Sequence, residues 1–188
     1  ADIFITMRRG GNHIYALNVL DPTSPQVMWK KSNSDTGFSE LGQTWSRPKS
    51  AKLIGYANTV LIFGAGYDTA EDTEPPGVNS VGRGIYIVDA ATGVLIWSAT
   101  TSSSGTTSCS GSTTQATCLV AGMDYSIPSD ITLVDHDGNG KIDRLYAADT
   151  GGNIWRVDLE LPPLPNVPPD PPNSPRNTPN FWQITNHS

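Results

Sequence analysis

The sequence has few basic residues and no long apolar run. Its 188 residues include 12 Lys and Arg against 18 Asp and Glu, which gives a net charge of −6 at pH 7. Without a block of positive charge to displace counterions, the chain lacks the usual means of binding a nucleic-acid backbone. No run approaches the ~20 apolar residues of a membrane-spanning helix, so no membrane span is predicted.

Catalytic motifs are also missing. The sequence contains no G-x-S-x-G, no H-E-x-x-H and no phosphate-binding P-loop pattern. The sequence does not exclude a pair of catalytic carboxylates for glycoside hydrolysis, because the two members of such a pair come together only in the folded chain. We therefore expect a protein that is not an enzyme.

The beginning of the chain carries neither an initiator Met nor a signal peptide. It opens directly on the apolar run Ile3–Ile5, which indicates a segment of a longer polypeptide. Only 16% of the residues are charged, whereas Ser, Thr, Gly and Asn are abundant. This surface chemistry is more common outside the cell than in the cytosol.

Cysteine is scarce, and Cys109 and Cys118 are the only two. They flank part of a polar low-complexity segment, because thirteen of the residues 100–117 are Ser or Thr. A local disulfide in an oxidising compartment is the leading interpretation, and two unrelated reduced cysteines are the alternative. A metal site at these thiols is not expected, because no second Cys or His pair lies nearby.

Glycine and proline, by contrast, are frequent, at 18 and 15 residues, too many for a mainly helical protein. Short β-branched or alternating runs recur, and no stretch shows sustained helical periodicity. These features predict an all-β chain.

Two patterns repeat in the same order along the chain, and both are strand-like. The first pattern is Ile, an aromatic residue, any residue, and Val or Leu before Asp or Asn, and it forms three runs: Ile14–Asn18, Ile85–Asp89 and Ile154–Asp158. An apolar run precedes each copy and a Trp-bearing run follows it. The second pattern is an aromatic residue and Ser shortly before Pro and then an apolar run, and it opens two units: Trp45–Ile54 and Tyr125–Val134.

Four antiparallel strands per unit are the blade of a β-propeller, so the repeats predict a partial propeller of four-stranded blades over residues 1–188. About three blades are present; because three cannot close a ring, the segment should be part of a larger one. A β-sandwich of unrelated hairpins is the weaker alternative. The predicted segments are a blade part at 1–31, a blade at 44–99 with an insertion at 67–83, a Ser/Thr-rich linker at 100–124, and a blade at 125–187 with a Pro-rich insertion at 162–179.

The sharpest chemical signal is an Asp- and Asn-rich loop that has the ligand spacing of an EF-hand without its helices. The candidate ligands are side chains at loop positions 1, 3, 5 and 9 and the main-chain carbonyl at position 7: Asp135, Asp137, Asn139, Asp143 and, for the carbonyl, Lys141. Gly140 at position 6 permits the sharp turn, and Ca²⁺ prefers such hard oxygen ligands. Three carboxylates this close would repel one another without a cation. The loop therefore predicts bound calcium, with a metal-free hairpin as the alternative.

The twelfth position of this loop departs from the calcium-binding pattern. Tyr146 stands there in place of the bidentate Glu. The coordination shell must therefore be completed by water, by both oxygens of one Asp, or by a neighbouring group such as Asp130 or Asp149. We expect a modest affinity, with a dissociation constant of about 10⁻⁴–10⁻³ M.

The run Asp89–Trp97 resembles the repeats of quinoprotein dehydrogenases, propellers that bind pyrroloquinoline quinone and calcium. Those enzymes typically carry an adjacent Cys-Cys pair beside the cofactor, and the separated Cys109 and Cys118 do not match it. A quinoprotein-like dehydrogenase is kept as an alternative function, and a purely structural extracellular propeller is a second.

Taken together, the chain resembles the C-terminal β-propeller of the PilC/PilY-type type IV pilus biogenesis proteins. The resemblance covers most of the chain outside the Ser/Thr-rich and Pro-rich segments, and it rests on four runs: Leu41–Pro48, Phe63–Asp68, Gly84–Asp89 and Asp135–Leu159. The order and spacing of these runs are specific, whereas any one of them alone is not.

This resemblance implies a protein of the pilus tip, cell surface or outer membrane, reached through the periplasm. It implies roles in pilus assembly, twitching motility and host adhesion, with the calcium site controlling the balance between pilus extension and retraction. The implied partners are minor pilins and other pilus-tip proteins, host surface receptors, and the remainder of the same propeller. The implied calcium ligands are the five residues of the acidic loop.

Overall fold

The computed structural model describes residues 1–160, 178–179 and 182–187, and in them the chain is almost entirely β. Two short 3₁₀ turns, η1 (Arg8–Gly10) and η2 (Thr69–Asp72), are the helical elements of these residues. The predicted all-β class is confirmed. Most of the Pro-rich insertion predicted at 162–179 lies outside the described residues.

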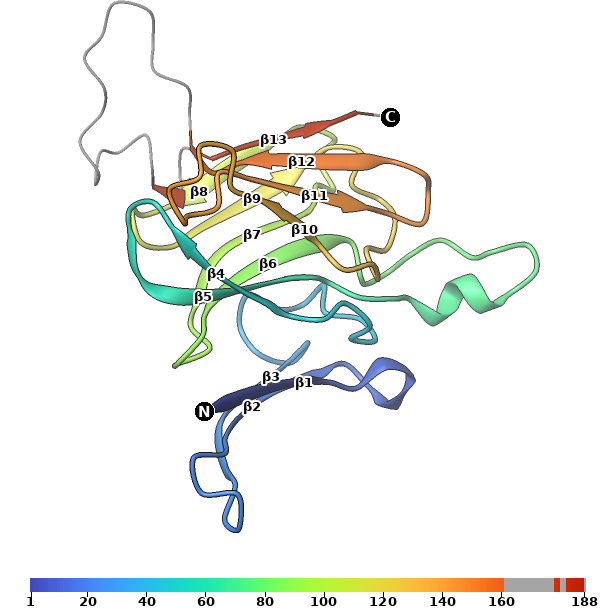
Figure 1. Ribbon diagram of the computed structural model, residues 1–188. Helices are drawn as coiled ribbons and strands as arrows, with labels where there is room; N and C mark the ends of the chain where they lie inside the picture. The colour runs from blue at the N-terminus through green and yellow to red at the C-terminus, as the bar shows by residue number, and fades with distance from the viewer. Residues whose placement is uncertain (161–177, 180–181, 188) are drawn as a thin grey trace, which may run out of the picture.

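In the described residues, thirteen strands form three open sheets that follow one another in chain order (Figure 1). The first sheet contains β1 (Asp2–Thr6), β2 (His13–Asn18) and β3 (Gln26–Ser32). The second contains β4 (Lys49–Leu53), β5 (Tyr56–Gly64), β6 (Gly84–Asp89), β7 (Leu95–Thr101), β8 (Ser108–Gly111) and β9 (Ala116–Val120). The third contains β10 (Thr132–Val134), β11 (Arg144–Ala148), β12 (Ile154–Asp158) and β13 (Gln183–Asn186).

The repeated runs occupy equivalent places in the three sheets. The runs Ile14–Asn18, Ile85–Asp89 and Ile154–Asp158 lie in β2, β6 and β12. Each of these strands pairs antiparallel with the strand before it and the strand after it in the chain. The first sheet has three strands, and no strand of the described residues pairs with the free edge of β1.

The second sheet has six strands, where the repeat predicted four. The segment predicted as a linker at 100–124 contains the hairpin β8–β9, and β9 pairs parallel to β7 from Trp97↔Ala116 to Thr101↔Val120. Only three side chains of β9 are buried, and they alternate with exposed or half-exposed ones. This weak alternation lies within a Ser/Thr-rich segment, which is why the sequence indicated a loop.

The local disulfide predicted for the two cysteines is confirmed. Cys109 of β8 and Cys118 of β9 are directly paired across the hairpin and bonded to each other. Cys118 is fully buried, whereas Cys109 is exposed. The disulfide therefore attaches the outer edge strand of the sheet to the core.

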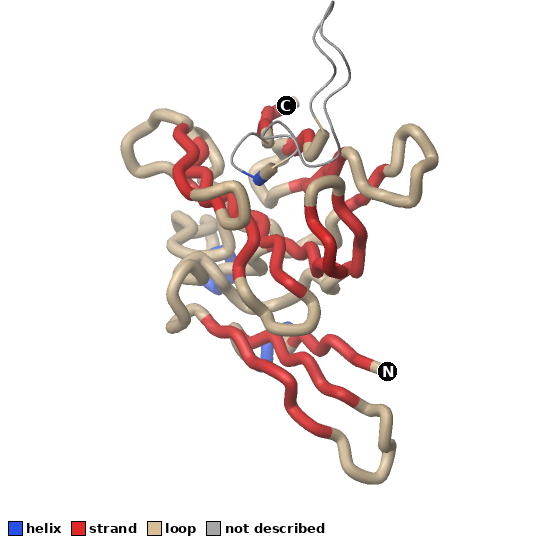
Figure 2. The backbone as a smooth tube through the Cα atoms, turned by 90° about the vertical axis from the view of Figure 1, so that its left-hand side faces the viewer, coloured by secondary structure: helices blue, strands red, loops and turns tan. Residues whose placement is uncertain are grey.

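The central strands β6 and β7 of the second sheet are buried on both faces, because the other two sheets pack against this sheet. Along β6, Ile85 and Ile87 belong to the core shared with the third sheet, whereas Tyr86 and Val88 belong to the core shared with the first. Alternate side chains of a strand point to opposite faces, so both faces of a central sheet read as apolar. Figure 2 shows the first sheet below the other two, with the N-terminus at the edge strand β1.

Candidate metal centre

The predicted calcium loop joins β10 to β11. Val134 and Arg144 are paired across the hairpin, so residues 135–143 form its connection. Gly138 and Gly140 have φ values of 75° and 82°, a left-handed conformation that glycine adopts without steric cost. These two positions let the loop fold back so that its carboxylates converge.

Three of the predicted ligands come together in this loop. One carboxylate oxygen from each of Asp135, Asp137 and Asp143 lies within 4.8 Å of the other two. Asp135 and Asp137 are exposed, whereas Asp143 is buried. Negative charges at this separation repel one another, and a divalent cation between them would convert that repulsion into attraction.

Asp143 is the residue whose environment tests the fit of a metal ion. Its side chain is 4% exposed. Oδ2 accepts a hydrogen bond from the main-chain N–H of His136, whereas Oδ1 has no hydrogen-bond partner among the described residues. A buried carboxylate oxygen without a donor is unfavourable, and such an oxygen is the ligand type that Ca²⁺ prefers. The donor set therefore fits calcium.

Main-chain N–H groups of the loop hold the carboxylate of Asp135. Gly140 donates to Oδ2 at 2.8 Å and Gly138 donates to Oδ1 at 2.8 Å. These hydrogen bonds, that of Gly140 first, lower the pKa of Asp135, because they stabilise the charged form. Asp135 is therefore ionised over the whole physiological pH range.

Asn139 and Lys141 are less clearly positioned to bind an ion than the three aspartates are. The Asn139 amide nitrogen donates to Oδ2 of Asp137 at 2.8 Å, and its Oδ1 accepts the main-chain N–H of Lys141 at 2.8 Å. Asn139 is thus part of the cluster, but its nitrogen faces the carboxylate. Ligation through its Oδ1 would require the side chain to turn, and the carbonyl of Lys141 stays a prediction.

Glu160 is a further carboxyl at this site that the sequence prediction did not include. Burial first, and the neighbouring Asp143 carboxyl second, raise the pKa of Glu160 to about 7. Ionisation of Glu160 would add a further negative charge beside Asp143.

The hairpin register was the signal that could have identified Glu160. Ala148 pairs with Ile154, and the pairing continues outward to Arg144 and Asp158. One further step brings Asp143 opposite residue 159, and the main-chain N–H of Leu159 does donate to the Asp143 carbonyl oxygen at 2.8 Å. Glu160 is the next residue along the chain.

The two neighbouring carboxylates considered from sequence are engaged elsewhere. Asp130 accepts hydrogen bonds from the main-chain N–H of Arg47 at 2.8 Å and from its Nε at 2.7 Å. Asp149 accepts from the Asn153 amide and from Nε1 of Trp155 at 2.9 Å. Neither belongs to the cluster of Asp135, Asp137 and Asp143, so we do not expect either to complete the coordination shell of an ion there.

The loop is also attached to the second sheet. The main-chain N–H of Ile142 donates to the carbonyl oxygen of Lys52 in β4 at 2.9 Å. The Ile142 side chain packs against the core between the second and third sheets. The position of Asp143 is thus fixed through its neighbour by a hydrogen bond and by apolar contacts.

Comparison with known proteins agrees with the resemblance seen in the sequence. No family model matches the chain. It is 27% identical over 157 residues to the type IV pilus biogenesis factor PilY1 of Pseudomonas aeruginosa strain UCBPP-PA14, a match over 82% of this chain and 11% of the relative. It is 28% identical over 154 residues to a PilY1 homolog of Xylella fastidiosa, over 80% of this chain and 9% of the relative. The homologues of this chain are PilY1 type IV pilus biogenesis factors.

A solved structure extends the PilY1 comparison to the fold. The crystal structure of the P. aeruginosa PilY1 C-terminal domain superimposes with a TM-score of 0.60 at 24% sequence identity, over 85% of this chain and 27% of that chain. The likeness shows that the two share a fold. The chain spans about a tenth of the length of the curated PilY1 relatives. Among residues 1–160, 178–179 and 182–187, no helix has the length and hydropathy needed to cross a membrane.

Proposed function

We propose that this chain is a calcium-binding β-propeller segment of a type IV pilus tip-associated protein. In that protein it would regulate pilus extension and retraction and thereby support twitching motility and surface adhesion. The pilus part of the proposal rests on the PilY1 relatives. The calcium part rests on the β10–β11 loop.

A single observation carries the calcium proposal: the buried Asp143 has an oxygen without a donor and lies beside two further carboxylates. Oδ1 of Asp143 has no partner in the described residues, and Asp135 and Asp137 each place an oxygen within 4.8 Å of its carboxylate. Asp135, Asp137 and Asp143 would hold the ion, with Asn139 and the Lys141 carbonyl as further ligands. The ion would supply positive charge at the point where the loop concentrates negative charge.

The β10–β11 loop is hydrogen-bonded to its surroundings at two points, and through them a change in the loop can affect other parts of the fold. Ile142 is bonded to Lys52 of the second sheet, and Asp143 is bonded to Leu159 after β12. Neutralising the carboxylates therefore stabilises a loop that touches two sheets at once. We propose that this holds the surface around the loop in one conformation for a protein partner.

The propeller part of the proposal is supported by how the sheets stack. The second sheet carries one core on each face, as a blade does between two neighbours. The outer face of the first sheet exposes Ile3, Ile5 and Val27 at 45%, 40% and 63%. An apolar face of this kind is what a further blade of a larger ring would cover.

Partners and location follow from the pilus assignment. The relatives are named as biogenesis factors of the type IV pilus, so we propose protein partners at the pilus tip, minor pilins among them, with host surface receptors as further candidates. We propose an extracytoplasmic location at the pilus tip, cell surface or outer membrane. The disulfide fits an oxidising compartment.

The alternatives are less well supported. A quinoprotein-like dehydrogenase would need a cofactor site, and the cysteines that such a site would place side by side are joined instead across the β8–β9 hairpin. The relatives are named as biogenesis factors and not as dehydrogenases. We therefore propose a protein that is not an enzyme.

Calorimetric titration with CaCl₂ tests the metal proposal on the chain itself. Wild type should bind one Ca²⁺ per chain with a dissociation constant of about 10⁻⁴–10⁻³ M. Asp135→Ala should bind none under the same conditions. Asp21→Ala is the matched control, because Asp21 also accepts main-chain hydrogen bonds in an exposed turn and lies in the connection between β2 and β3 of the first sheet. It should bind as wild type does.

Equal calcium binding by wild type and Asp135→Ala would contradict the proposal. The pilus role needs a second measurement, in which the full-length protein carrying this segment is tested for surface piliation and twitching. If calcium binding is lost while piliation and twitching are unchanged, the regulatory role is contradicted, and the chain is a structural propeller segment that binds an incidental ion.

A further inference from the structure

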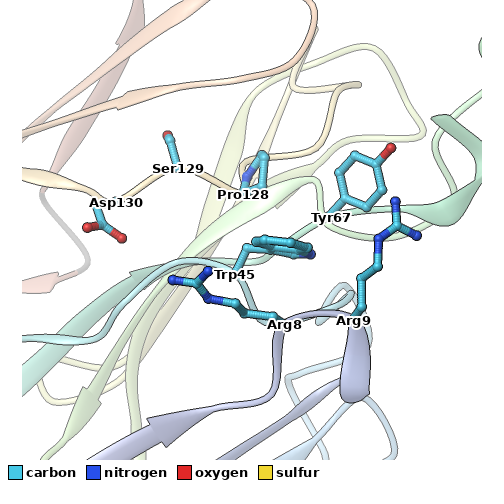
Figure 3. A pocket seen from close by; sticks show the side chains of 7 residues that line it. All are labelled: Arg8, Arg9, Trp45, Tyr67, Pro128, Ser129 and Asp130. Carbon is cyan, nitrogen blue, oxygen red and sulfur yellow. The ribbon is translucent and has the colours of Figure 1, made fainter. Parts of the chain in front are cut away.

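A groove lies where connections of all three sheets meet (Figure 3). Its volume is 530 Å³. It is lined by the η1 turn, by the connections before β4 and after β5, and by the connection before β10, through Arg8, Arg9, Trp45, Tyr67, Pro128 and Asp130. None of these residues belongs to the loop 135–143, so the groove is separate from the metal centre.

The walls of the groove are tied together by main-chain hydrogen bonds. The N–H of Arg8 donates to the carbonyl oxygen of Thr44 at 3.0 Å. Gln43 and Tyr67 exchange two hydrogen bonds, each of 2.9 Å, between their main chains. The groove is therefore preformed, and a ligand would bind without first ordering its walls.

Aromatic rings and a proline form the apolar part of the groove. Trp45, Tyr67 and Pro128 are all half-buried and face the same space (Figure 3). The Arg8 guanidinium lies over the Trp45 ring at 5.3 Å from its centroid, and that of Arg9 lies 5.9 Å from the Tyr67 centroid. Such stacking holds an arginine in place while leaving its N–H groups free to donate.

The charges of the groove are paired with one exception. Arg9 makes a two-pronged ion pair with Asp72, both bonds being 2.8 Å. Asp130 of the groove is paired with Arg47. Arg8 has no carboxylate within 4.0 Å among the described residues. In a chain with a net charge of −6, it is an uncommitted cation in an apolar groove.

The backbone of Arg8 is held in an unfavourable conformation. Its φ is +49°, and it is the non-glycine residue with a positive φ in the described residues. This conformation costs about 1 kcal/mol for such a residue. Residues held in this way cluster at binding sites, where the surrounding structure enforces a required side-chain direction. Here the direction enforced is over Trp45.

We propose that this groove binds an extended segment of a protein partner, in which an Asp or Glu is adjacent to an aliphatic side chain. The carboxylate would accept charge-assisted hydrogen bonds from Arg8. The aliphatic side chain would lie against Trp45, Tyr67 and Pro128. The volume of the groove corresponds to a few residues of such a segment and not to a folded domain.

A protein ligand is favoured because the proposal rests on the proposed function in a pilus assembly. An acidic saccharide would use the same arginine, but it would also need an open aromatic face on which a sugar ring can stack. One face of the Trp45 ring is occupied by Arg8. The saccharide is therefore treated as an outcome of the test.

The test begins with a random dodecapeptide library displayed on phage and selected on the wild-type chain. The enriched sequences should contain Asp or Glu next to an aliphatic residue. The top peptide and its Glu→Gln or Asp→Asn counterpart are then titrated by calorimetry. The acidic peptide should bind Arg8→Gln about tenfold more weakly than wild type, as loss of a charge-assisted hydrogen bond implies. Lys30→Gln removes the same charge from an exposed site on β3 and should bind as wild type does.

Circular dichroism of Arg8→Gln shows whether the fold is retained. Trp45→Leu is a second variant, which removes the aromatic wall of the groove and leaves its charges unchanged. The proposal is overturned if no peptide is enriched, if the enriched peptides lack an acidic residue, or if Arg8→Gln binds them unchanged. It is also overturned if an array of acidic glycans, and not the peptides, shows Arg8-dependent binding. Calcium binding measured on the same preparations separates this outcome from failure of the metal proposal.

Discussion

The indole Nε1 of Trp29 donates a hydrogen bond of 3.0 Å to the carbonyl oxygen of Ala90. Trp29 belongs to β3 of the first sheet, and Ala90 follows β6 of the second. The residue is 8% exposed and belongs to the core cluster that also contains Tyr86 and Val88 of the second sheet. One residue of a repeated Trp-bearing strand thus joins two successive sheets by a polar and an apolar contact.

Trp29→Phe should weaken this junction while keeping an aromatic ring in it. The variant loses the hydrogen bond to Ala90 and part of the buried area, so the free energy of unfolding should fall by about 1–3 kcal/mol. Urea denaturation followed by circular dichroism measures the change. Val27→Ala, on the same strand at a side chain that is 63% exposed, should change it by less than about 0.5 kcal/mol. Equal effects of the two substitutions would show that Trp29 does not support the junction.

Gly93→Ala should be destabilising because the Trp29 ring lies directly on this glycine. A Cβ at Gly93 would come within 2.7 Å of the ring. Gly105 has almost the same backbone, with φ of 69° against 68°, but no atom lies within 4 Å of the added Cβ. Gly105→Ala should therefore show only the backbone cost of about 1 kcal/mol. Gly93→Ala should lose a further 1–3 kcal/mol or so, as overpacking does.

The difference between the two alanine variants isolates the contact with Trp29. In a Trp29→Phe background the smaller ring gives way, and the extra destabilisation by Gly93→Ala should shrink. An equal loss of stability in Gly93→Ala and Gly105→Ala would mean that the Trp29 ring moves aside with no loss of unfolding free energy, and would contradict this prediction.

The sequence predicted those features that depend on residues close together in the chain. The three copies of the Ile-aromatic run lie in β2, β6 and β12, because alternation along a single strand determines which residues are buried. The cluster of Asp135, Asp137 and Asp143 was likewise predicted from sequence, because its carboxylates lie within nine residues and the glycines of the loop permit the turn.

Features that depend on pairing between distant segments were missed. Glu160 reaches the candidate metal centre only through the register of β11 with β12. The hairpin of Cys109 and Cys118 becomes part of the sheet only by parallel pairing with β7. The groove around Arg8 and Trp45 is assembled from connections of three sheets. The alternation of residues along a single strand, on which the sequence prediction relied, contains no information on these contacts.

Tyr56 should make the stability of the fold fall in alkaline solution. Burial first, and the hydrogen bond that its hydroxyl donates to Asp89 second, raise the pKa of Tyr56 from 10.0 to about 12. Between these two values the unfolded chain has lost the tyrosine proton while the folded chain retains it. Raising the pH therefore favours unfolding in this window, and the stabilisation is fully present below pH 10.

The loss attributable to Tyr56 should be about 1–2 kcal/mol between pH 10 and pH 12, less than the whole shift implies because the side chain is only partly buried. Tyr56→Phe removes the titrating group and should abolish this part of the pH dependence. The measurement is the difference in unfolding free energy between the two proteins across the window, in which the other titrating groups cancel. A constant difference would contradict the assignment.

Asp143→Asn should separate the metal-free stability of the chain from its stability with calcium. Without metal, the substitution removes a buried negative charge beside Asp135 and Asp137, and the Asn oxygen can still accept the N–H of His136. In EDTA the variant should therefore be at least as stable as wild type. In millimolar CaCl₂, wild type should gain stability as ligand binding to the folded state requires, and the variant should gain little or none. Thermal unfolding in both buffers, with Asp21→Asn as the exposed control, measures this crossover. If Asp143→Asn is destabilised equally with and without calcium, the carboxylate stabilises the fold itself, and the proposal that it binds calcium is contradicted.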